Sequence, residues 1–421
     1  MKIRRLLVSN FRAFEGDRAF EFSDRFAVVA GINGQGKTSL LDGLASILMQ
    51  FLAELGVTTS YRYGRWKSSD INANQYSAQV SIAARCAGIP VNNYSVSLYR
   101  TDAWSGARAK TRTDHLAPAV ARTILAAYGD PATPEDQAPI AVYYTTDRAG
   151  YRLPKSLPTD LPVVRQIAYR GALSNRMVDY RDLMARYVVW SRQPESRERR
   201  AFDRALGVFL PGFSEVEIGQ DPLRLTIRKE EVRISLQQLS DGERAFLAVI
   251  GDLVRRLALA NPDLDDPLQG HGIVLIDELE LHLHPRWQRE VVEKMRVTFP
   301  NIQFIATTHS PFVIQSLRPG ELINLDPEEF GDYANQSVED IAEHVMGVDV
   351  PQKSERYIEM MEAAESYYRL LQQPNVGPDV IAAAEIELNR LSVRFSDDAA
   401  YHAMLKLELE ARKAEIAHAA G

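Results

Sequence analysis

The stretch Gly31-Ile-Asn-Gly-Gln-Gly-Lys-Thr38 fits the phosphate-loop pattern G-x-x-x-x-G-K-[S/T]. Residues 26–30 before it are all apolar and predict a buried strand, while residues 37–49 have apolar side chains at helical spacing. Glycines let the backbone approach phosphate oxygens closely, and the start of the following helix adds its dipole to the anion site. The stretch therefore predicts a strand, a phosphate-binding loop and a helix.

This loop predicts a site for ATP with Mg²⁺. Lys37 can reach the β- and γ-phosphates, and the Thr38 hydroxyl can bind the metal ion. The loop residues expected to contact the nucleotide are Asn33, Gly34, Gly36, Lys37, Thr38 and Ser39.

A second stretch, Gly272-Ile-Val-Leu-Ile-Asp-Glu278, has four apolar residues followed by two acids. A buried strand here would carry Asp277 to its carboxyl end, where the carboxylate can bind Mg²⁺ together with Thr38. Glu278 is placed to polarise an attacking water as the catalytic base. Many strands end in two acids, so this interpretation depends on the phosphate loop.

The stretch Leu239-Ser-Asp-Gly-Glu-Arg244 resembles the signature loop of the ABC-type ATPases, which reads Leu-Ser-Gly-Gly-Gln or a variant of it. The Ser240 hydroxyl and the Gly242 amide, at a helix N-terminus, can form a second phosphate cradle. Ser240 can equally be an N-cap, with Glu243 completing a capping box. Both interpretations can hold at once.

His309 follows the apolar run Ile302–Ala306 and resembles the switch histidine of the same ATPases. Alone, such a histidine would be interpreted as structural. In this order of motifs it is expected to contact the γ-phosphate as a catalytic residue. The resemblance also implies that the signature of one subunit completes the phosphate-loop site of another. The expected assembly is a homodimer of ATPase heads, or a higher homo-oligomer, with two ATP molecules between the heads.

The opening segment Ile3–Phe14 resembles the first strand of RecF, SMC and OLD heads, where Asn-Phe-Arg or Asn-Phe-Lys recurs, and is unlike a transporter cassette. Arg12 is then expected to contact the nucleotide. An OLD-type nuclease would need a TOPRIM domain after the head, but the chain beyond His309 has no Asp-x-Asp pair. The chain is therefore not expected to be a nuclease itself.

The motifs, an arginine-rich insertion and an acidic tail together resemble the PtuA-like ATPases of Septu and related retron defence systems. That resemblance implies a separate HNH nuclease partner, PtuB-like, and restriction of phage. AriA-like ATPases of another defence system are close rivals. The alternative function is that of a RecF-like, DNA-binding repair ATPase without a nuclease partner.

The expected fold is α/β: an ABC-type ATPase head with a mostly parallel P-loop sheet and an antiparallel β part. We expect four regions along the chain. They are an N-terminal lobe with the P-loop (1–148), a helical arginine-rich insertion (149–212), a C-terminal lobe with the signature, acids and switch histidine (213–325), and an acidic helical partner-binding region (326–421).

Charge is distributed unevenly along the 421 residues. The total is −7, yet residues 321–421 alone carry −13, so the preceding residues are net positive. Between residues 165 and 204, ten arginines stand against five acids, which is typical either of a nucleic-acid contact or of a solvated helical face. In the tail an apolar helical face suggests protein docking, or packing on the head or on a second copy. Its members are Tyr357, Met360, Met361, Ala364, Tyr368 and Leu371.

The remaining sequence features concern location and open ligands. Cys86 is the only cysteine, so an intramolecular disulfide is impossible, and no apolar run is long enough to span a membrane. The expected location is the cytoplasm. His282 and His284 are expected to be structural. The glutamine usual after the strand at 140–145 is replaced by a segment ending in Arg148, so Mg²⁺ ligation there stays open.

Overall fold

The computed structural model describes residues 1–56, 67–86, 88–100, 109–128, 138–150, 154–174, 178–193, 195–220, 223–325, 336–348, 351, 354–371, 373 and 376–392. The chain divides into two compact units, Met1–Gly347 and Val348–Gly421. The first unit mixes helices with three sheets, and the described part of the second unit is helical.

A five-stranded parallel sheet lies at the centre of the first unit, with strand order β13-β3-β12-β11-β7. Four of its strands are buried along their whole length, as in parallel sheets covered on both faces. Because the strands are parallel, their carboxyl ends meet at one edge, where such sheets bind ligands. The strands are β3 (Phe26–Ala30), β7 (Ile140–Tyr144), β11 (Gly272–Ile276), β12 (Ile302–Thr307) and β13 (Leu322–Asn324).

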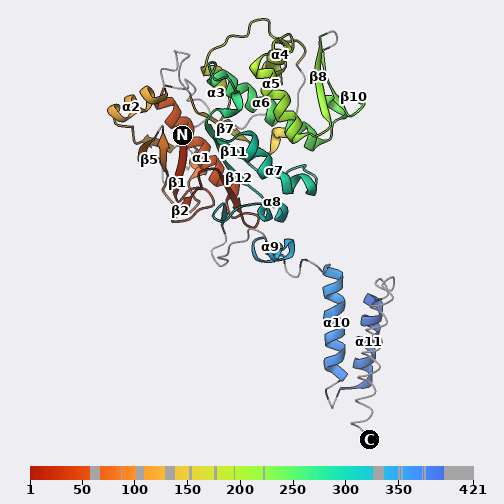
Figure 1. Cartoon of the computed structure of the whole chain (residues 1–421). Coiled ribbons are helices and arrows are strands. Elements are labelled where there is room, and N and C mark those ends of the chain that lie inside the picture. The colour runs from red at the N-terminus through yellow and green to blue at the C-terminus, as the bar shows by residue number, and fades with distance from the viewer. Residues whose placement is uncertain are drawn as a thin grey trace. The chain divides into compact units, whose positions relative to one another are not determined.

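An antiparallel sheet of order β2-β1-β4-β5-β6 forms a second layer. Helix α1 (Lys37–Glu54) contacts strands of both sheets and buries its apolar residues between them (Figure 1). The helix that begins with the phosphate loop is therefore held from two sides. The strands of this layer are β1 (Lys2–Ser9), β2 (Asp17–Glu21), β4 (Ser77–Cys86), β5 (Ile89–Arg100) and β6 (Ala109–Thr113).

Helix α6 (Asp241–Ala260) is buried over most of its length, and the insertion packs against it. The insertion consists of α3 (Gln166–Tyr169), α4 (Tyr180–Ser191) and α5 (Arg197–Phe209). A three-stranded antiparallel sheet follows, formed by β8 (Phe213–Gln220), β9 (Leu223–Lys229) and β10 (Val232–Ser235). The other helices of this unit are α2 (Pro118–Tyr128), α7 (Pro285–Thr298), α8 (Pro311–Gln315) and α9 (Val338–His344).

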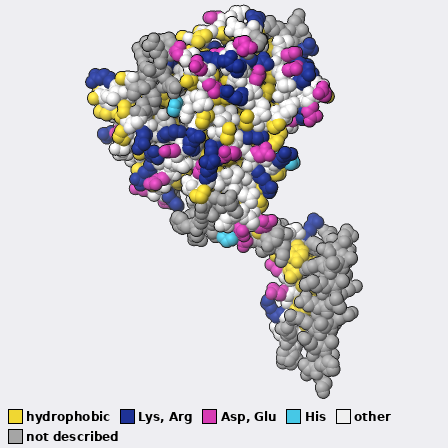
Figure 2. Space-filling model, viewed as in Figure 1, with side chains coloured by type: hydrophobic (Ala, Val, Ile, Leu, Met, Phe, Trp, Pro, Cys, Tyr) yellow, Lys and Arg dark blue, Asp and Glu magenta, His cyan; other side chains and the backbone are white. Residues whose placement is uncertain are grey.

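Several arginines of the insertion belong to the packing rather than to a free basic surface. Arg165 and Arg186 are buried, and Arg197 donates to the carbonyl oxygens of Ala258 at 3.2 Å and Asn261 at 3.0 Å. Figure 2 shows Lys and Arg interspersed with Asp and Glu over the visible face of the first unit. Fewer arginines are thus available for a basic surface than the ten counted between residues 165 and 204. The exposed arginines of the insertion that the structure describes are Arg170, Arg181, Arg192, Arg200 and Arg204.

The expected boundary before residue 326 differs from the observed division at Gly347. Helix α9 still belongs to the first unit, because Ile341 and Val345 pack in a buried cluster with Ala30 and Ile314. Gly347 ends this unit beside the phosphate loop: a Cβ added to it would lie 3.4 Å from Cγ2 of Ile32.

The apolar face expected on the tail is largely covered within the described part of the second unit itself. Helix α10 (Glu355–Leu371) packs on α11 (Pro378–Ser392), and Met360, Ala364 and Tyr367 are buried with Leu388. Tyr367, which the sequence analysis omitted, is fully buried, whereas Met361 is 39% exposed. The face points slightly differently from the expected one because it follows the contact with α11. Across the helices that the structure describes, none is long and apolar enough to cross a membrane.

Candidate functional site

The phosphate loop lies between β3 and α1, and its glycines have backbone angles that other residues avoid. The φ angles of Gly31, Gly34 and Gly36 are 145°, 88° and 101°. A Cβ on Gly36 would lie 2.9 Å from Cζ of Phe14, whereas one on Gly34 would meet no atom within 4 Å. Gly36 is therefore required by packing, and Gly34 leaves space open where a phosphate can approach.

Lys37 is folded back over this loop. Its Nζ donates to the carbonyl oxygens of Gly31 at 2.7 Å and Ile32 at 2.9 Å, and the residue is buried. Burial lowers the pKa of Lys37, and the carboxylates of Asp277, Glu278 and Glu280 oppose that shift. The ammonium group thus stands between the loop and three acids, where phosphate oxygens would replace its carbonyl partners.

Asp277 and Thr38 form the oxygen-rich part of the site. The Thr38 hydroxyl donates to Oδ2 of Asp277 at 3.1 Å, and the Thr307 hydroxyl donates to Oδ1 at 2.6 Å. A hydroxyl and a carboxylate are ligands that Mg²⁺ prefers, and this ion usually takes few protein ligands beside phosphates and water. Thr38 and Asp277 therefore fit Mg²⁺. The described residues contain no group of three or more His, Cys, Asp or Glu able to hold a metal on its own.

Glu278 follows in a left-handed turn with φ 48°. Its amide donates to the Thr307 hydroxyl at 2.8 Å, and the next amide, that of Leu279, donates to the Thr307 carbonyl oxygen at 2.9 Å. Strand β12 therefore fixes the turn that presents the Glu278 carboxylate. A half-buried carboxylate beside Asp277 can accept a proton from water at this edge of the sheet.

His309 reaches the same edge from the end of β12, and a residue that the sequence analysis missed holds it there. Glu280 accepts from the His309 amide, and its Oε2 accepts from the Thr308 hydroxyl at 2.7 Å. Burial, and then the charge of Lys37, lower the pKa of His309, so the imidazole is neutral at neutral pH. The alternation Glu278-Leu-Glu280 was the available signal, since it places a second acid two residues after the first.

Ser240 and Gly242 begin α6. The Ser240 side chain accepts from the Glu243 amide at 3.3 Å, and Glu243 accepts from the Ser240 amide at 2.8 Å, so the capping box is present. Ser240 is exposed, which leaves it open to a second molecule. A Cβ on Gly242 would lie only 2.5 Å from the His282 carbonyl oxygen, so the start of α6 packs directly on the loop after Glu278.

Arg12 lies beside α1 but is held by acids. Its Nε donates to Oδ1 of Asp70 at 2.8 Å, and its Nη1 pairs with Asp42. Contact of Arg12 with a nucleotide requires that its guanidinium share or exchange Asp70 and Asp42.

His284, as expected, has a structural contact, because its Nδ1 accepts from the Arg286 amide at 3.2 Å as the N-cap of α7.

Arg148 occupies the region where a glutamine was expected. It is 5% exposed and donates to backbone carbonyl oxygens of the turn after β11, including those of Asp277 and Glu278. The sequence left the role of this segment open. In the structure the Arg148 side chain binds the backbone of the two acids, not their carboxylates.

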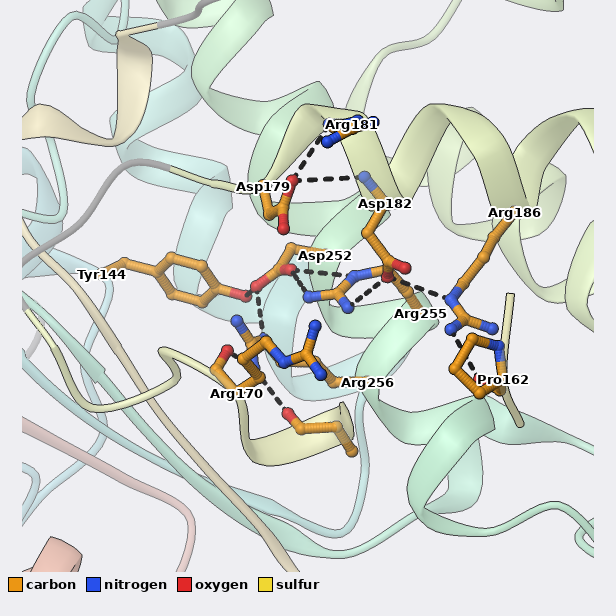
Figure 3. A network of polar contacts seen from close by, with 11 residues as sticks. Tyr144, Pro162, Arg170, Asp179, Arg181, Asp182, Arg186, Asp252, Arg255 and Arg256 are labelled. Atoms are coloured by element: carbon orange, nitrogen blue, oxygen red, sulfur yellow. Dashed lines mark hydrogen bonds and ion pairs between the residues drawn. The ribbon is translucent and has the colours of Figure 1, made fainter. Parts of the chain in front are cut away.

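A buried polar network joins β7 to α6 and to the insertion (Figure 3). The Tyr144 hydroxyl donates to Oδ2 of Asp252 at 2.9 Å, and Asp252 also pairs with Arg255 and Arg256. Arg255 extends the network to Asp182 on α4 at 2.7 Å. Burial alone would raise the pKa of Asp252, but Arg256 and Arg255 outweigh it, and the pKa lies below its usual range. The helix that carries Ser240 is thereby tied to the strand beside β11.

The family model described as "AAA domain, putative AbiEii toxin, Type IV TA system" matches residues 26–315. This range begins at β3 and ends in α8, so it includes the phosphate loop, the signature, both acids and His309. The chain belongs to this family. Together with the parallel sheet and the order of the motifs, the match makes it an ABC-type ATPase of the RecF, SMC and OLD group.

Individual relatives include a retron ATPase and a Septu protein. The "Retron Ec83 probable ATPase" of Escherichia coli is 48% identical over 122 residues, which cover 29% of this chain and 22% of that protein. The "Septu protein PtuA" of Bacillus thuringiensis is 34% identical over 167 residues, which cover 36% and 41%. The matched segments thus span less than half the length of these relatives.

Solved structures with a similar fold include head domains. An Smc head bound to the C-winged helix domain of ScpA covers 73% of this chain and 89% of its own, with 19% identity and a TM-score of 0.44. The recombination mediator protein RecF covers 73% and 92%, with 12% identity and a TM-score of 0.39.

Proposed function

We propose that the chain binds and hydrolyses ATP as the ATPase subunit of an anti-phage defence complex. The observation that carries the ATPase proposal is the meeting of five side chains from three segments at one sheet edge. Lys37 and Thr38 begin α1 at the end of the loop after β3, Asp277 and Glu278 follow β11, and His309 follows β12. Direct hydrogen bonds connect Thr38 to Asp277 and Thr307 to the turn of Glu278.

Each residue then has a role that its position suits. Lys37 and the amides of Asn33, Gly34, Gly36 and Ser39 bind the phosphates. Thr38 and Asp277 would hold Mg²⁺, which neutralises phosphate charge when bound. Glu278 accepts a proton from the attacking water. The neutral imidazole of His309 donates a hydrogen bond to the γ-phosphate, with its backbone fixed by Glu280.

The exposed start of α6 supports a shared site in this proposal. Ser240 and Gly242 of a second copy would bind the γ-phosphate held by the first, in a homodimer of heads or a larger homo-oligomer. The backbone amides at this helix start and the Ser240 hydroxyl are donors suited to an anion.

The ATPase proposal is tested with the purified chain. Wild-type protein should bind a fluorescent ATP analogue and release phosphate in the presence of Mg²⁺. Lys37→Ala should bind at least about 10-fold more weakly, because it loses the cation that faces the phosphates. Unchanged nucleotide affinity in this variant would contradict the phosphate-loop assignment. Lys294→Ala, which removes a cation paired with Glu290 on α7, is the control.

The defence proposal extends to a separate HNH nuclease, PtuB-like, as the protein partner. The retron and Septu relatives support it, and the acidic second unit is the proposed docking region. The exposed arginines of the insertion are the proposed contact for nucleic acid, since arginines bind phosphate backbones.

Deleting residues 352–421 tests the docking region. The truncated chain should keep its nucleotide affinity and lose co-purification of the proposed HNH nuclease partner. Retained co-purification would show that the partner binds elsewhere. A plaque assay in cells carrying both genes tests restriction of phage, with Lys37→Ala as the inactive reference.

A further inference from the structure

The turn that carries the two acids is held by one buried side chain from another segment. Arg148 lies in a short 3-10 helix, Thr146–Ala149, directly after β7. Its Nη1 donates to the Asp277 carbonyl oxygen at 2.5 Å, and its Nη2 donates to the carbonyl oxygens of Glu278 and, at 3.3 Å, Leu279. One planar guanidinium thus binds three successive carbonyl groups of the turn.

The amide side of the same turn is fixed independently. The Asp277 amide donates to the Tyr144 carbonyl oxygen at 2.9 Å, and the next two amides donate to Thr307. The peptide groups of this turn are therefore bound on both sides. A non-glycine residue with positive φ, as at Glu278, persists where the surroundings fix it in this way.

Arg148 is charged in this position, although burial is unfavourable for it. An arginine guanidinium keeps its proton in proteins, so this group presents only donors. Among the ion pairs between described residues, none joins Arg148 to a carboxylate; its hydrogen bonds go to backbone oxygens. A buried guanidinium that binds only carbonyl groups serves to orient those groups.

We propose that Arg148 is a positioning residue for ATP hydrolysis, which holds the Asp277–Leu279 turn so that Glu278 faces the attacking water. This inference rests on the proposed ATPase function. The side-chain direction of Glu278 follows from the two peptide planes around its Cα, and Arg148 binds the carbonyl of each. The hydrogen bonds of Arg148 go to backbone carbonyl oxygens, so in this proposal it acts on the reaction through the turn.

Two substitutions separate orientation from packing. In Arg148→Lys, one ammonium can reach one or two of the carbonyl oxygens but cannot span all three. In Arg148→Met, the apolar stem remains and all donors are lost. We expect kcat to fall about 10-fold for the lysine variant and roughly 100-fold for the methionine variant, because small misplacements of catalytic groups lower the rate by such factors. The KM for ATP and the affinity for a fluorescent analogue should stay within about threefold, because Lys37 and the loop are unchanged.

Arg197→Met is the matched control. Arg197 also binds three backbone carbonyl oxygens, those of Ala258, Asn261 and Leu264, but they lie at the end of α6 and in the loop after it. This variant should lose melting temperature without losing kcat. Partial recovery of kcat from methionine to lysine at position 148 is the further sign of orientation, since a loss of packing alone would follow the melting temperature.

The outcomes are distinct. A lysine variant with wild-type kcat overturns the inference. The inference is also overturned if an Arg148 variant and Arg197→Met lose the same melting temperature and the Arg148 variant loses no more kcat than Arg197→Met does. If the methionine variant does not fold, the lysine variant decides the question alone. A folded wild-type chain that binds ATP but releases no phosphate overturns the proposed function and this inference together.

Discussion

Thr307 and Asp277 share a hydrogen bond of 2.6 Å, donated by the Thr307 hydroxyl to Oδ1. The same hydroxyl accepts from the Glu278 amide at 2.8 Å. One fully buried side chain at the end of β12 therefore fixes the carboxylate proposed to bind Mg²⁺ and the backbone of the proposed base.

Replacing Thr307 tests this relationship. Thr307→Val keeps the volume but leaves the Glu278 amide without its acceptor, so the free energy of unfolding should fall by about 1–3 kcal/mol and kcat should fall with it. Thr307→Ser keeps the hydroxyl and should retain most of both. Urea unfolding and phosphate release measure the two effects. Equal kcat in the valine and serine variants would show that the hydroxyl is not needed.

Glu278→Gln should bind ATP normally and hydrolyse it at least about 100-fold more slowly, because an amide cannot accept the proton of the attacking water. Thr38 and Asp277 are unchanged, so ATP should persist between paired heads and lengthen the lifetime of the dimer. Size-exclusion chromatography with ATP and a phosphate-release assay measure these effects. Wild-type turnover in this variant would show that Glu278 is not the base and would make His309 the next candidate.

Mixing two inactive variants tests the shared site. Ser240→Arg should leave nucleotide affinity nearly intact but block turnover, since its signature serves the opposite subunit. Combined with Lys37→Ala, it should restore turnover, because one site of the mixed dimer has both an intact loop and an intact signature. If the mixture is no more active than either variant alone, then either the shared site or one-site hydrolysis is wrong.

Gly242→Ala should destabilise the chain, since its Cβ would lie 2.5 Å from the His282 carbonyl oxygen and the backbone must move. Gly207→Ala on α5 is the control: a Cβ there meets nothing within 4 Å. That helical substitution should stabilise by about 0.4–1 kcal/mol. Thermal melts of the two variants should therefore shift in opposite directions, and a shift in the same direction would contradict the close approach.

Asp252→Asn should lower the free energy of unfolding by about 3 kcal/mol at neutral pH, because Arg255 and Arg256 would lose a buried charge partner. The pKa of Asp252 is lowered in the folded chain, so its contribution is complete above the unfolded value of about 4 and is lost as pH falls below it. The difference between wild type and variant should then shrink in acid. A difference independent of pH from 6 to 2 would rule out a charged Asp252.

The sequence predicted those parts of the site that are encoded by neighbouring residues. The apolar run before Gly31 and the one before Asp277 each gave a strand, and the acids and glycines follow directly. The sequence could not assign contacts to Thr307, Glu280 and Arg148, because the hydrogen-bond partner of each residue lies at the end of a different strand. The buried network of Asp252 could not be predicted for the same reason. In the sequence its charged residues are typical of a solvated helix surface, and only the packing of α4 on α6 buries them.

Helical periodicity alone identified most of the apolar face of α10, but it included Met361 and omitted Tyr367. Tyr367 is buried and Met361 is partly exposed because the neighbouring helix, rather than the spacing, determines which residues are covered. The short strand β13 pairs with β3 beside the phosphate loop and has only three residues, too few for a pattern to reveal it.

Gly347 gives the first unit an exit point next to its phosphate loop. A Cβ there would lie in van der Waals contact with Ile32, and α9 just before it packs on Ala30, the residue that precedes Gly31. A shift of Ile32 therefore has to be accommodated by the packing around Gly347, so the phosphate loop and the end of the first unit are coupled through this contact.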